Sequence, residues 1–273
     1  MQHHRRRVVP ILAALLLALT TAPAGLASGA PAPDQAAPDQ AAPAANAANA
    51  AKPFRLDLAD RNDFVAQTNF VQCVGASMQM MLNIMGDGDR SAKTQARLQV
   101  LARNLSGPTR AGFQRQGASV RGWTDGLNQL AAGPFRLVGT DTIDEALRLA
   151  AKSIRQTGKP VGLLVWSGRH AWVMSGFQAT ADPRRTDDFR VTNAVILDPL
   201  YPYGSSKWGP SPRPREAISV ATLGRQFVPR RRGTWAGAPT GAAGATMSAL
   251  AGKYVIVMPY TPIVAVRGRH VAV

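Results

Sequence analysis

The spacing of apolar residues changes once along this chain, at the turn-forming run Gly158-Lys159-Pro160, and this change limits the possible folds more than any other feature. Before it, apolar residues recur every three to four positions, which predicts helices that pack through one face. After it, short apolar or alternating runs are bounded by Gly, Pro and Asp, which predicts strands. Helices followed by a sheet indicate an α+β domain.

Four helices are expected before the change and five strands after it. The helices are expected from residue 74 to the glycine at 86, from 91 to 105, from 120 to 132, and from a capping-box pattern at 142–145 to Gly158. The strands are expected at 161–166, 171–177, 191–197, 254–258 and 263–266. Residues 199–252 show little periodicity and predict a long irregular loop, either a substrate-facing flap or a wrapped surface loop.

The first 30 residues have the layout of a secretory signal peptide. A basic start with three consecutive arginines is followed by the apolar stretch 8–19 and by small residues at 22–30, the type at which signal peptidases cut. We therefore expect residues 1–30 to be removed and the protein to be secreted or extracytoplasmic, in the cell envelope. The alternative is an uncleaved anchor, although the apolar stretch is shorter than the ~20 residues of a spanning helix.

Residues 31–52 are rich in Ala, Pro and Asn and contain almost nothing that packs, so they predict a linker. Residues 53–273 then form one domain, long enough to bury a substantial core. This part carries 28 Lys and Arg against 14 Asp and Glu, a net charge of +14. Such a charge favours electrostatic association with an anionic cell envelope. No nucleic-acid partner is expected, because the arginines are scattered and no nucleic-acid motif accompanies them; the oligomeric state stays unknown.

Cys73 is the one cysteine of the chain. An exported protein with a single cysteine forms no internal disulfide and exposes a thiol to oxidation, so this residue needs a reason to be present. The helix expected from residue 74 places Cys73 at or just before a helix N-terminus, where the helix dipole and free N–H groups stabilise a thiolate. The alternative is a buried structural thiol. The methionines of this helix are expected to pack in the core, and nothing indicates a cofactor or a metal site.

His170 opens one predicted strand, and Asp198 follows the next. Two of the four histidines leave with the signal peptide and His270 lies in a basic run near the end, so His170 is the candidate base. The two strands are expected to form an antiparallel hairpin, and if Phe177 faces Val191, constant register sets His170 opposite Asp198. A carboxylate there would orient the imidazole and stabilise its charged form. The alternatives are a core histidine and an ordinary strand-ending turn.

Four segments agree in order and spacing with a known pattern. They are Gln67, six residues before the cysteine; residues 72–78, QCVGASM, at a helix start; residues 158–161, GKPV, which lead to 170–177, HAWVMSGF; and residues 197–199, LDP. Together they resemble papain-like cysteine peptidases, particularly the bacteriocin-processing peptidases that remove double-glycine leaders and their free-standing secreted relatives. The resemblance covers about residues 64–200. It implies a papain-like α+β fold, in which N-terminal helices carry the cysteine and an antiparallel sheet carries the histidine and aspartate.

By this resemblance, Cys73 is the nucleophile and His170 is the general base that later acts as the acid. Asp198 orients His170, and the Gln67 amide forms an oxyanion hole with the Cys73 backbone N–H. The same roles follow from chemistry, because attack on an acyl carbonyl needs an activated sulfur, a proton shuttle and donors for the oxyanion. The resemblance implies a secreted cysteine peptidase or amidase that cleaves a peptide bond or a cell-wall amide.

Two departures from the family pattern leave parts of this interpretation open. The family usually has Gly-Pro after the cysteine, where this chain has Val74-Gly75, which bears on activity. This chain also lacks a transporter segment, which leaves the identity of the substrate open. Asn69 and Gln72 are alternative oxyanion donors to Gln67. The alternative functions are a transglutaminase-like acyltransferase, which passes the acyl group to an amine, and a catalytically silent papain-like module that binds the cell envelope.

Overall fold

The computed structural model describes residues 52–107, 116–130, 132–231 and 249–262, all within one compact unit. The predicted signal peptide, linker residues 31–51, the strand predicted at 263–266 and His270 lie outside the described residues.

Helices form where the apolar periodicity predicted them, and three of them begin at a hydroxyl cap. The side chains of Ser91, Ser119 and Thr142 each accept a hydrogen bond from the backbone N–H three residues further on. The fourth predicted helix ends at Gly158, whose left-handed φ of 66° suits a residue without a Cβ. The helices are α1 (Cys73–Ile84), α2 (Ala92–Asn104), α3 (Val120–Gln129), α4 (Ile143–Thr157) and the short α5 (Val220–Gly224), with a 3-10 turn η2 (Arg61–Asp63) before α1.

The strands form a seven-stranded sheet in which the described pairings are antiparallel. Its order is β2-β9-β3-β4-β5-β8, and β1 pairs with β4 beyond the end of β3. A separate hairpin is formed by β6 and β7. The strands are β1 (Phe54–Asp57), β2 (Phe135–Thr140), β3 (Val161–Val165), β4 (His170–Ala179), β5 (Val191–Leu197), β6 (Gly204–Ser205), β7 (Gly209–Pro210), β8 (Glu216–Ser219) and β9 (Tyr254–Pro259).

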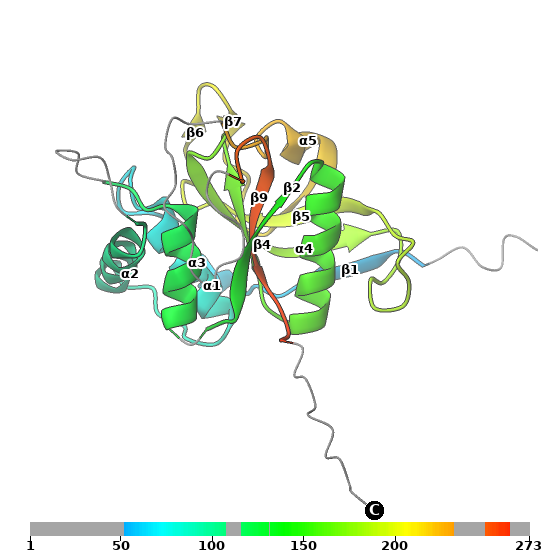
Figure 1. Ribbon diagram of the computed structural model, residues 1–273, viewed down its shortest axis with the longest axis horizontal. Coiled ribbons are helices and arrows are strands. Elements are labelled where there is room, and N and C mark those ends of the chain that lie inside the picture. Colours follow the sequence, from blue (N-terminus) through cyan, green and yellow to red (C-terminus); the bar gives the residue numbers. More distant parts are fainter. Residues whose placement is uncertain (1–51, 108–115, 131, 232–248, 263–273) are drawn as a thin grey trace, which may run out of the picture. The chain divides into compact units, whose positions relative to one another are not determined.

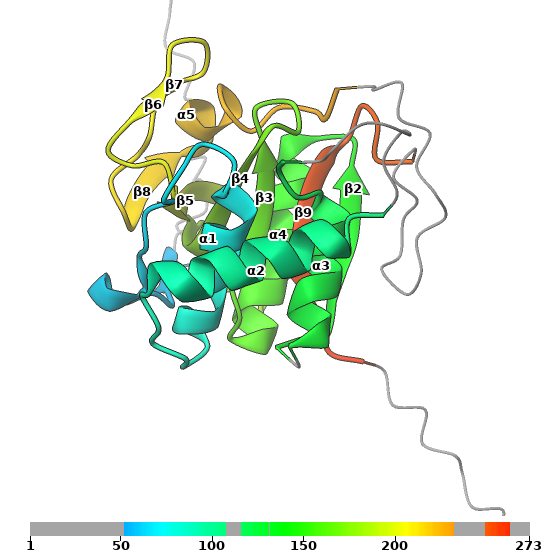
Figure 2. The same cartoon turned by 90° about the vertical axis from the view of Figure 1, so that its left-hand side faces the viewer.

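Helices cover both faces of the sheet, and each face buries its own core. On one face α4 packs its apolar stripe against the strands; on the other α1 and α3 do so (Figure 1). Helix α2 lies outside α1 and α3, where Figure 2 shows it crossing in front of them. The methionine stripe of α1 packs in the core, as predicted: Met78 and Met81 are fully buried, and Met85 is partly buried against the same cluster. This arrangement confirms the α+β class, with helices that carry Cys73 at the N-terminal end and a mainly antiparallel sheet.

Five strands were missed by the sequence analysis, three of them in the main sheet and two in the separate hairpin. Strands β1 and β2 lie before the change in periodicity, and β8 lies within residues 199–252, which also contain β6, β7 and α5. The description of that whole segment as an irregular loop was therefore wrong. Strand β2 did carry a signal: its Phe135 and Leu137 are buried while Arg136 between them is exposed, the alternation of a strand with one face in the core.

Candidate active site

Cys73 is the first residue of α1, as the sequence predicted. It is a free thiol, half-buried, and the first turn of α1 contains no acidic side chain that would oppose a thiolate. The helix dipole and the free N–H groups of that turn therefore act on the sulfur with no opposing charge from the same turn.

A hydrogen bond one turn later fixes α1 against the sheet. Ser77, fully buried and four residues after Cys73, donates its hydroxyl to the carbonyl oxygen of Ala171 at 3.1 Å. Residues four apart lie on the same face of a helix. Because Ala171 directly follows His170, this bond brings the face of α1 that carries the thiol to the start of β4.

His170 interacts with a carboxylate and with the thiol of Cys73. Its Nε2 is 2.7 Å from Oδ1 of Asp198, and both side chains are buried. With Nε2 bonded to Asp198, the ring's other nitrogen, Nδ1, is left for the sulfur. Burial alone lowers the pKa of the imidazole, but its interactions with Asp198 and with Cys73 favour the charged form and raise the pKa of His170 to about 9. The site therefore favours an imidazolium.

Asp198 directly follows the last residue of β5 and is fully buried. Its Oδ1 also accepts a hydrogen bond from the backbone N–H of Leu200 at 2.8 Å, which fixes the carboxylate in the turn. Its other oxygen has no hydrogen-bond partner among the described residues. The carboxylate is therefore held by one oxygen, the same oxygen that faces the imidazole.

The predicted register between β4 and β5 was wrong, although the predicted contact is present. Irregularities in the pairing, one of them at Ser175, set Phe177 opposite Ala194, not opposite Val191. Val173 pairs with Leu197, so continuing the ladder by one residue places Asp198 opposite Trp172. His170 is two residues further on the same face, and a diagonal neighbour at that spacing is within reach of its side chain.

Trp166 is a component of the site that the sequence analysis missed. Its ring stacks on the imidazole of His170, with ring centroids 4.2 Å apart and planes 25° apart. Gln226 accepts two hydrogen bonds from this tryptophan, one from the indole N–H to its side-chain oxygen and one from the backbone N–H to its carbonyl, both at 2.9 Å. Trp166 and Ser167 both have a φ of 56°, a strained conformation for residues other than glycine. This tight turn aims the indole back over the imidazole.

Gln67 lies in the segment before α1, next to the turn that follows Asp198. Its backbone N–H donates to the carbonyl oxygen of Pro199 at 2.7 Å, and its side-chain amide donates to the carbonyl oxygen of Asn69 at 2.9 Å. The alternative donors lie in the same segment. Their side-chain oxygens are used as acceptors, of the Val71 backbone N–H by Asn69 and of the Thr68 hydroxyl by Gln72. The fold thus brings Gln67 next to the turn that carries Asp198, and its role as oxyanion donor stays a prediction.

The described residues contain no group of three or more His, Cys, Asp or Glu side chains placed to hold a metal ion. Within the same ranges, no helix is long and apolar enough to cross a membrane. The arrangement of a thiol at a helix N-terminus, a buried imidazole and a buried carboxylate is suited to nucleophilic attack on an acyl carbon. Comparison of the chain with protein-family models, with curated proteins and with solved structures gave no match.

Proposed function

We propose that this protein is a secreted papain-like cysteine hydrolase that cleaves a peptide or amide bond with Cys73, His170 and Asp198. The observation that carries the proposal is the buried imidazole of His170, which lies 2.7 Å from a buried carboxylate and interacts electrostatically with the thiol of Cys73. A structural cysteine needs neither partner. A nucleophile needs both, because the imidazole has to ionise the thiol and then deliver a proton in a fixed direction.

The proposed reaction assigns one step to each of these groups. The Cys73 thiolate attacks the substrate carbonyl carbon, and the oxyanion that forms is stabilised by the Cys73 backbone N–H and the Gln67 amide. The His170 imidazolium gives its Nδ1 proton to the leaving amine, so the C–N bond breaks and a thioester remains. The neutral His170 then takes a proton from water, which attacks the thioester carbonyl carbon. The C–S bond breaks, the acid is released, and Cys73 leaves as the thiolate beside the reprotonated His170 imidazolium. Asp198 keeps Nε2 bonded throughout, so the imidazole does not rotate away from the sulfur.

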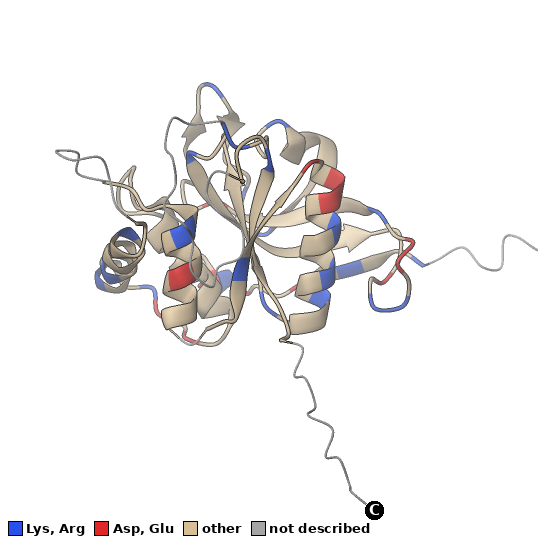
Figure 3. Ribbon diagram, viewed as in Figure 1, with Lys and Arg blue, Asp and Glu red and all other residues tan. Residues whose placement is uncertain are grey.

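The substrate class that fits this proposal is a peptide or a cell-wall amide. Lys and Arg positions are spread along the ribbon, on α2, α3, α4, β1 and several loops (Figure 3). An even positive charge of this kind supports general electrostatic association of the protein with an anionic envelope polymer, without a single binding patch. We place the protein outside the cytoplasm on the basis of the signal-like leader.

Two other functions use the same fold. Transfer of the acyl group to an amine, as in transglutaminase-like enzymes, needs the same three side chains and differs in what attacks the thioester. A catalytically silent envelope-binding module is favoured by one observation: Tyr203, in the turn after Asp198, is 70% exposed and available to contact a polymer. That reading predicts that Cys73→Ser leaves every function intact.

Labelling with a peptidyl epoxide tests the proposal. We expect one label per chain, on Cys73, with labelling slowed in His170→Ala because the thiol loses its ionising partner. Adding a primary amine to a thioester-forming substrate distinguishes the two chemistries, since an amide product indicates acyl transfer and a free acid indicates hydrolysis. A native protein that takes up no label, but is labelled once unfolded, would contradict both enzyme functions and favour the silent module.

A further inference from the structure

Three glutamines are buried between helices α1 and α2. Gln79, Gln95 and Gln99 have at most 4% of their surface exposed. A buried amide is costly unless its oxygen and nitrogen are both hydrogen-bonded, so the bonds of these side chains identify what each of them fixes. Gln95 and Gln99 bond to the segment that carries Gln67 and Cys73.

Gln99 ties together the two sides of the nucleophile. Its side-chain oxygen accepts the backbone N–H of Gly75 at 2.9 Å, and its amide donates to the carbonyl oxygen of Val71 at 2.9 Å. These two backbone groups lie two residues after and two residues before Cys73. A single side chain from α2 therefore fixes the backbone on both sides of the thiol. The bond to Gly75 also uses one of the N–H groups that a helix N-terminus leaves without a partner.

Gln95 fixes the backbone on both sides of Gln67, the predicted oxyanion donor. Its oxygen accepts the backbone N–H of Thr68 at 2.8 Å, and its amide donates to the carbonyl oxygen of Ala66 at 3.0 Å. Ala66 and Thr68 are the two neighbours of Gln67. Gln95 and Gln99 are four residues apart and so lie on one face of α2, separated by about one helical turn.

Glycine at position 75 permits this arrangement. A Cβ there would lie 2.8 Å from the carbonyl oxygen of Gln95 and 2.8 Å from Cβ of Gln99, closer than such atoms approach. The backbones of α1 and α2 therefore come this close only because residue 75 has no side chain. This accounts for the Gly75 of the Val74-Gly75 pair, where the resembled family has Gly-Pro.

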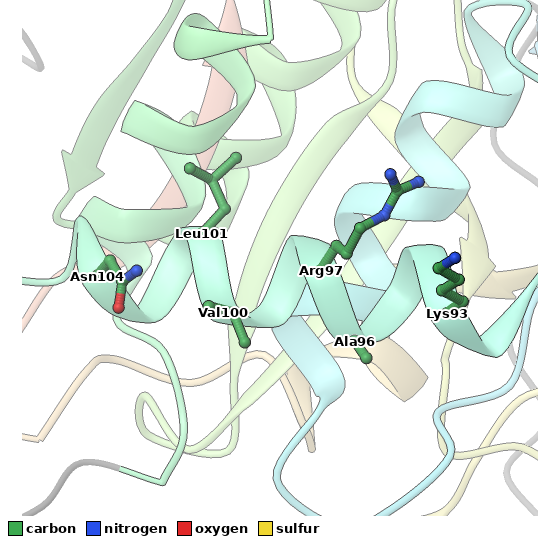
Figure 4. Close-up of a pocket in the computed structure, with 6 residues that line it drawn as sticks. All are labelled: Lys93, Ala96, Arg97, Val100, Leu101 and Asn104. Atoms are coloured by element: carbon green, nitrogen blue, oxygen red, sulfur yellow. The ribbon is translucent and has the colours of Figure 1, made fainter.

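The opposite face of α2 has a different character. It lines a pocket with Lys93, Ala96, Arg97, Val100, Leu101 and Asn104, and Figure 4 shows these six residues along the helix. Neither glutamine is among them, so substitutions of Gln95 and Gln99 leave that face unchanged.

We propose that Gln99 and Gln95 are positioning residues, through which α2 sets the place of Cys73 and of Gln67 relative to each other. The inference rests on the proposed function for its catalytic meaning, but the ordering of residues 66–75 by these two side chains is testable without it. Neither glutamine touches the substrate. Each acts through the backbone on both sides of a site residue.

Gln99→Leu is the main variant, and Gln79→Leu is its matched control. Gln79 is equally buried in the same interface, and its amide donates to the carbonyl oxygens of Asp89 and Ser91, away from the nucleophile. Its side-chain oxygen accepts a long hydrogen bond, 3.5 Å, from the amide of Gln95 and none from Gln99, so Gln79→Leu is a control for Gln99 and not for Gln95. Both substitutions remove a buried amide of the same size, so a general loss of stability affects both. Gln99→Glu is the second variant, because its carboxylate still accepts the Gly75 N–H but no longer donates to Val71.

Two measurements are made on each folded variant. Amide hydrogen exchange at Gly75 reports the ordering directly, and we expect it to become roughly fivefold faster in Gln99→Leu, because the N–H loses its acceptor. It should be unchanged in Gln99→Glu and in Gln79→Leu. The rate of Cys73 alkylation by iodoacetamide at pH 6 should fall about tenfold in both Gln99 variants, because a displaced thiol no longer faces the imidazole. Gln79→Leu should react as the wild type does.

The proposal is overturned if Gln99→Leu and Gln79→Leu give the same Gly75 exchange rate and the same alkylation rate. If the alkylation rate of the wild-type thiol has the pH dependence of an ordinary thiol, and His170→Ala does not change it, the proposed function fails instead. In that case the exchange rate at Gly75 alone decides whether Gln99 orders the segment. Gln95→Leu gives an independent check, since it should accelerate exchange at Thr68 and leave Gly75 unchanged.

Discussion

The two halves of the candidate site are built by different means. His170 and Asp198 belong to the sheet or directly follow it, are buried, and are fixed by a hydrogen bond to each other and by the stacked Trp166. The segment that carries Gln67 and leads to Cys73 is part loop and largely exposed, and side chains from α2 fix it. His170 is therefore fixed by the core, and the loop that leads to Cys73 is fixed by a few polar bonds. Substitutions in the first half should lower the free energy of unfolding, and substitutions in the loop should leave it nearly unchanged.

The largest expected effect is that of removing the buried carboxylate. Asp198→Ala leaves the His170 imidazolium buried without its partner, and breaking a buried pair in this way costs about 3–5 kcal/mol in the free energy of unfolding. Chemical denaturation at pH 6 measures this cost. Gln67→Ala is the comparison from the loop half and should cost less than about 1 kcal/mol, as substitutions outside the core usually do. Equal costs for the two variants would remove the distinction between the halves.

The half of the site formed by His170 and Asp198 should also make the free energy of unfolding depend on pH. The pKa of His170 is raised from its ordinary value of 6.5 to about 9 in the folded protein. Because the folded protein binds this proton more tightly than the unfolded chain, protonated His170 contributes its full stabilisation below pH 6.5. This stabilisation is lost as the pH rises through about 9. The loss is on the order of 3 kcal/mol, because each step of one in pKa corresponds to about 1.4 kcal/mol. Denaturation curves between pH 6 and 10 should show this decline in the wild type and not in His170→Gln.

Trp166 links the two halves, because it acts on the base and through it on the thiol. Trp166→Leu keeps an apolar cover over the imidazole and removes the aromatic face that stabilises its positive charge. We expect the pKa of His170 to fall by about one, measured by NMR titration of its ring protons. Gln226→Leu keeps the aromatic face and loses the indole hydrogen bond, so its effect should be smaller. If the pKa of His170 stays at about 9 in Trp166→Leu, the indole packs against the imidazole without stabilising its charge.

The smallest expected effect on stability is at the exposed tip of the loop half. Phe70, three residues before the nucleophile, is 85% exposed, so Phe70→Ser should change the free energy of unfolding by less than about 0.5 kcal/mol. If this segment contacts substrate, the same change should raise KM of a peptide substrate without changing the thiol pH profile. Val100→Ser, at a 44% exposed apolar residue on the outer face of α2, is the control and should alter neither.

The sequence predicted those parts of the molecule that local patterns determine. The helices α1 to α4 and strands β3, β4, β5 and β9 follow from periodicity and end signals. The contact of His170 with Asp198 was predicted from a constant register, and that register is wrong because β4 and β5 contain bulges. The contact is nevertheless present, because diagonal neighbours on one face of a sheet also meet. A bulge adds a residue without a distinctive sequence signal, so constant register was the simplest assumption.

The supporting residues could not be predicted, because their partners are distant in the sequence. Trp166 and Gln226 are 60 residues apart, and Gln99 is 24 residues from Gly75 and 28 from Val71. A glutamine on a helix usually predicts a solvent-facing position, and only the packing of α2 on α1 shows that Gln95 and Gln99 face inward.

The measurement that tests the account most directly is the pH dependence of Cys73 alkylation by iodoacetamide in the folded protein. A thiol at a helix N-terminus beside an imidazolium should react rapidly near pH 6, where an ordinary thiol with a pKa of about 8.5 is mostly protonated and slow. His170→Ala should move the profile towards higher pH, and Asp198→Ala should move it less, because the carboxylate acts through the imidazole. A wild-type profile typical of an ordinary thiol, and unchanged in His170→Ala, would contradict a catalytic Cys73.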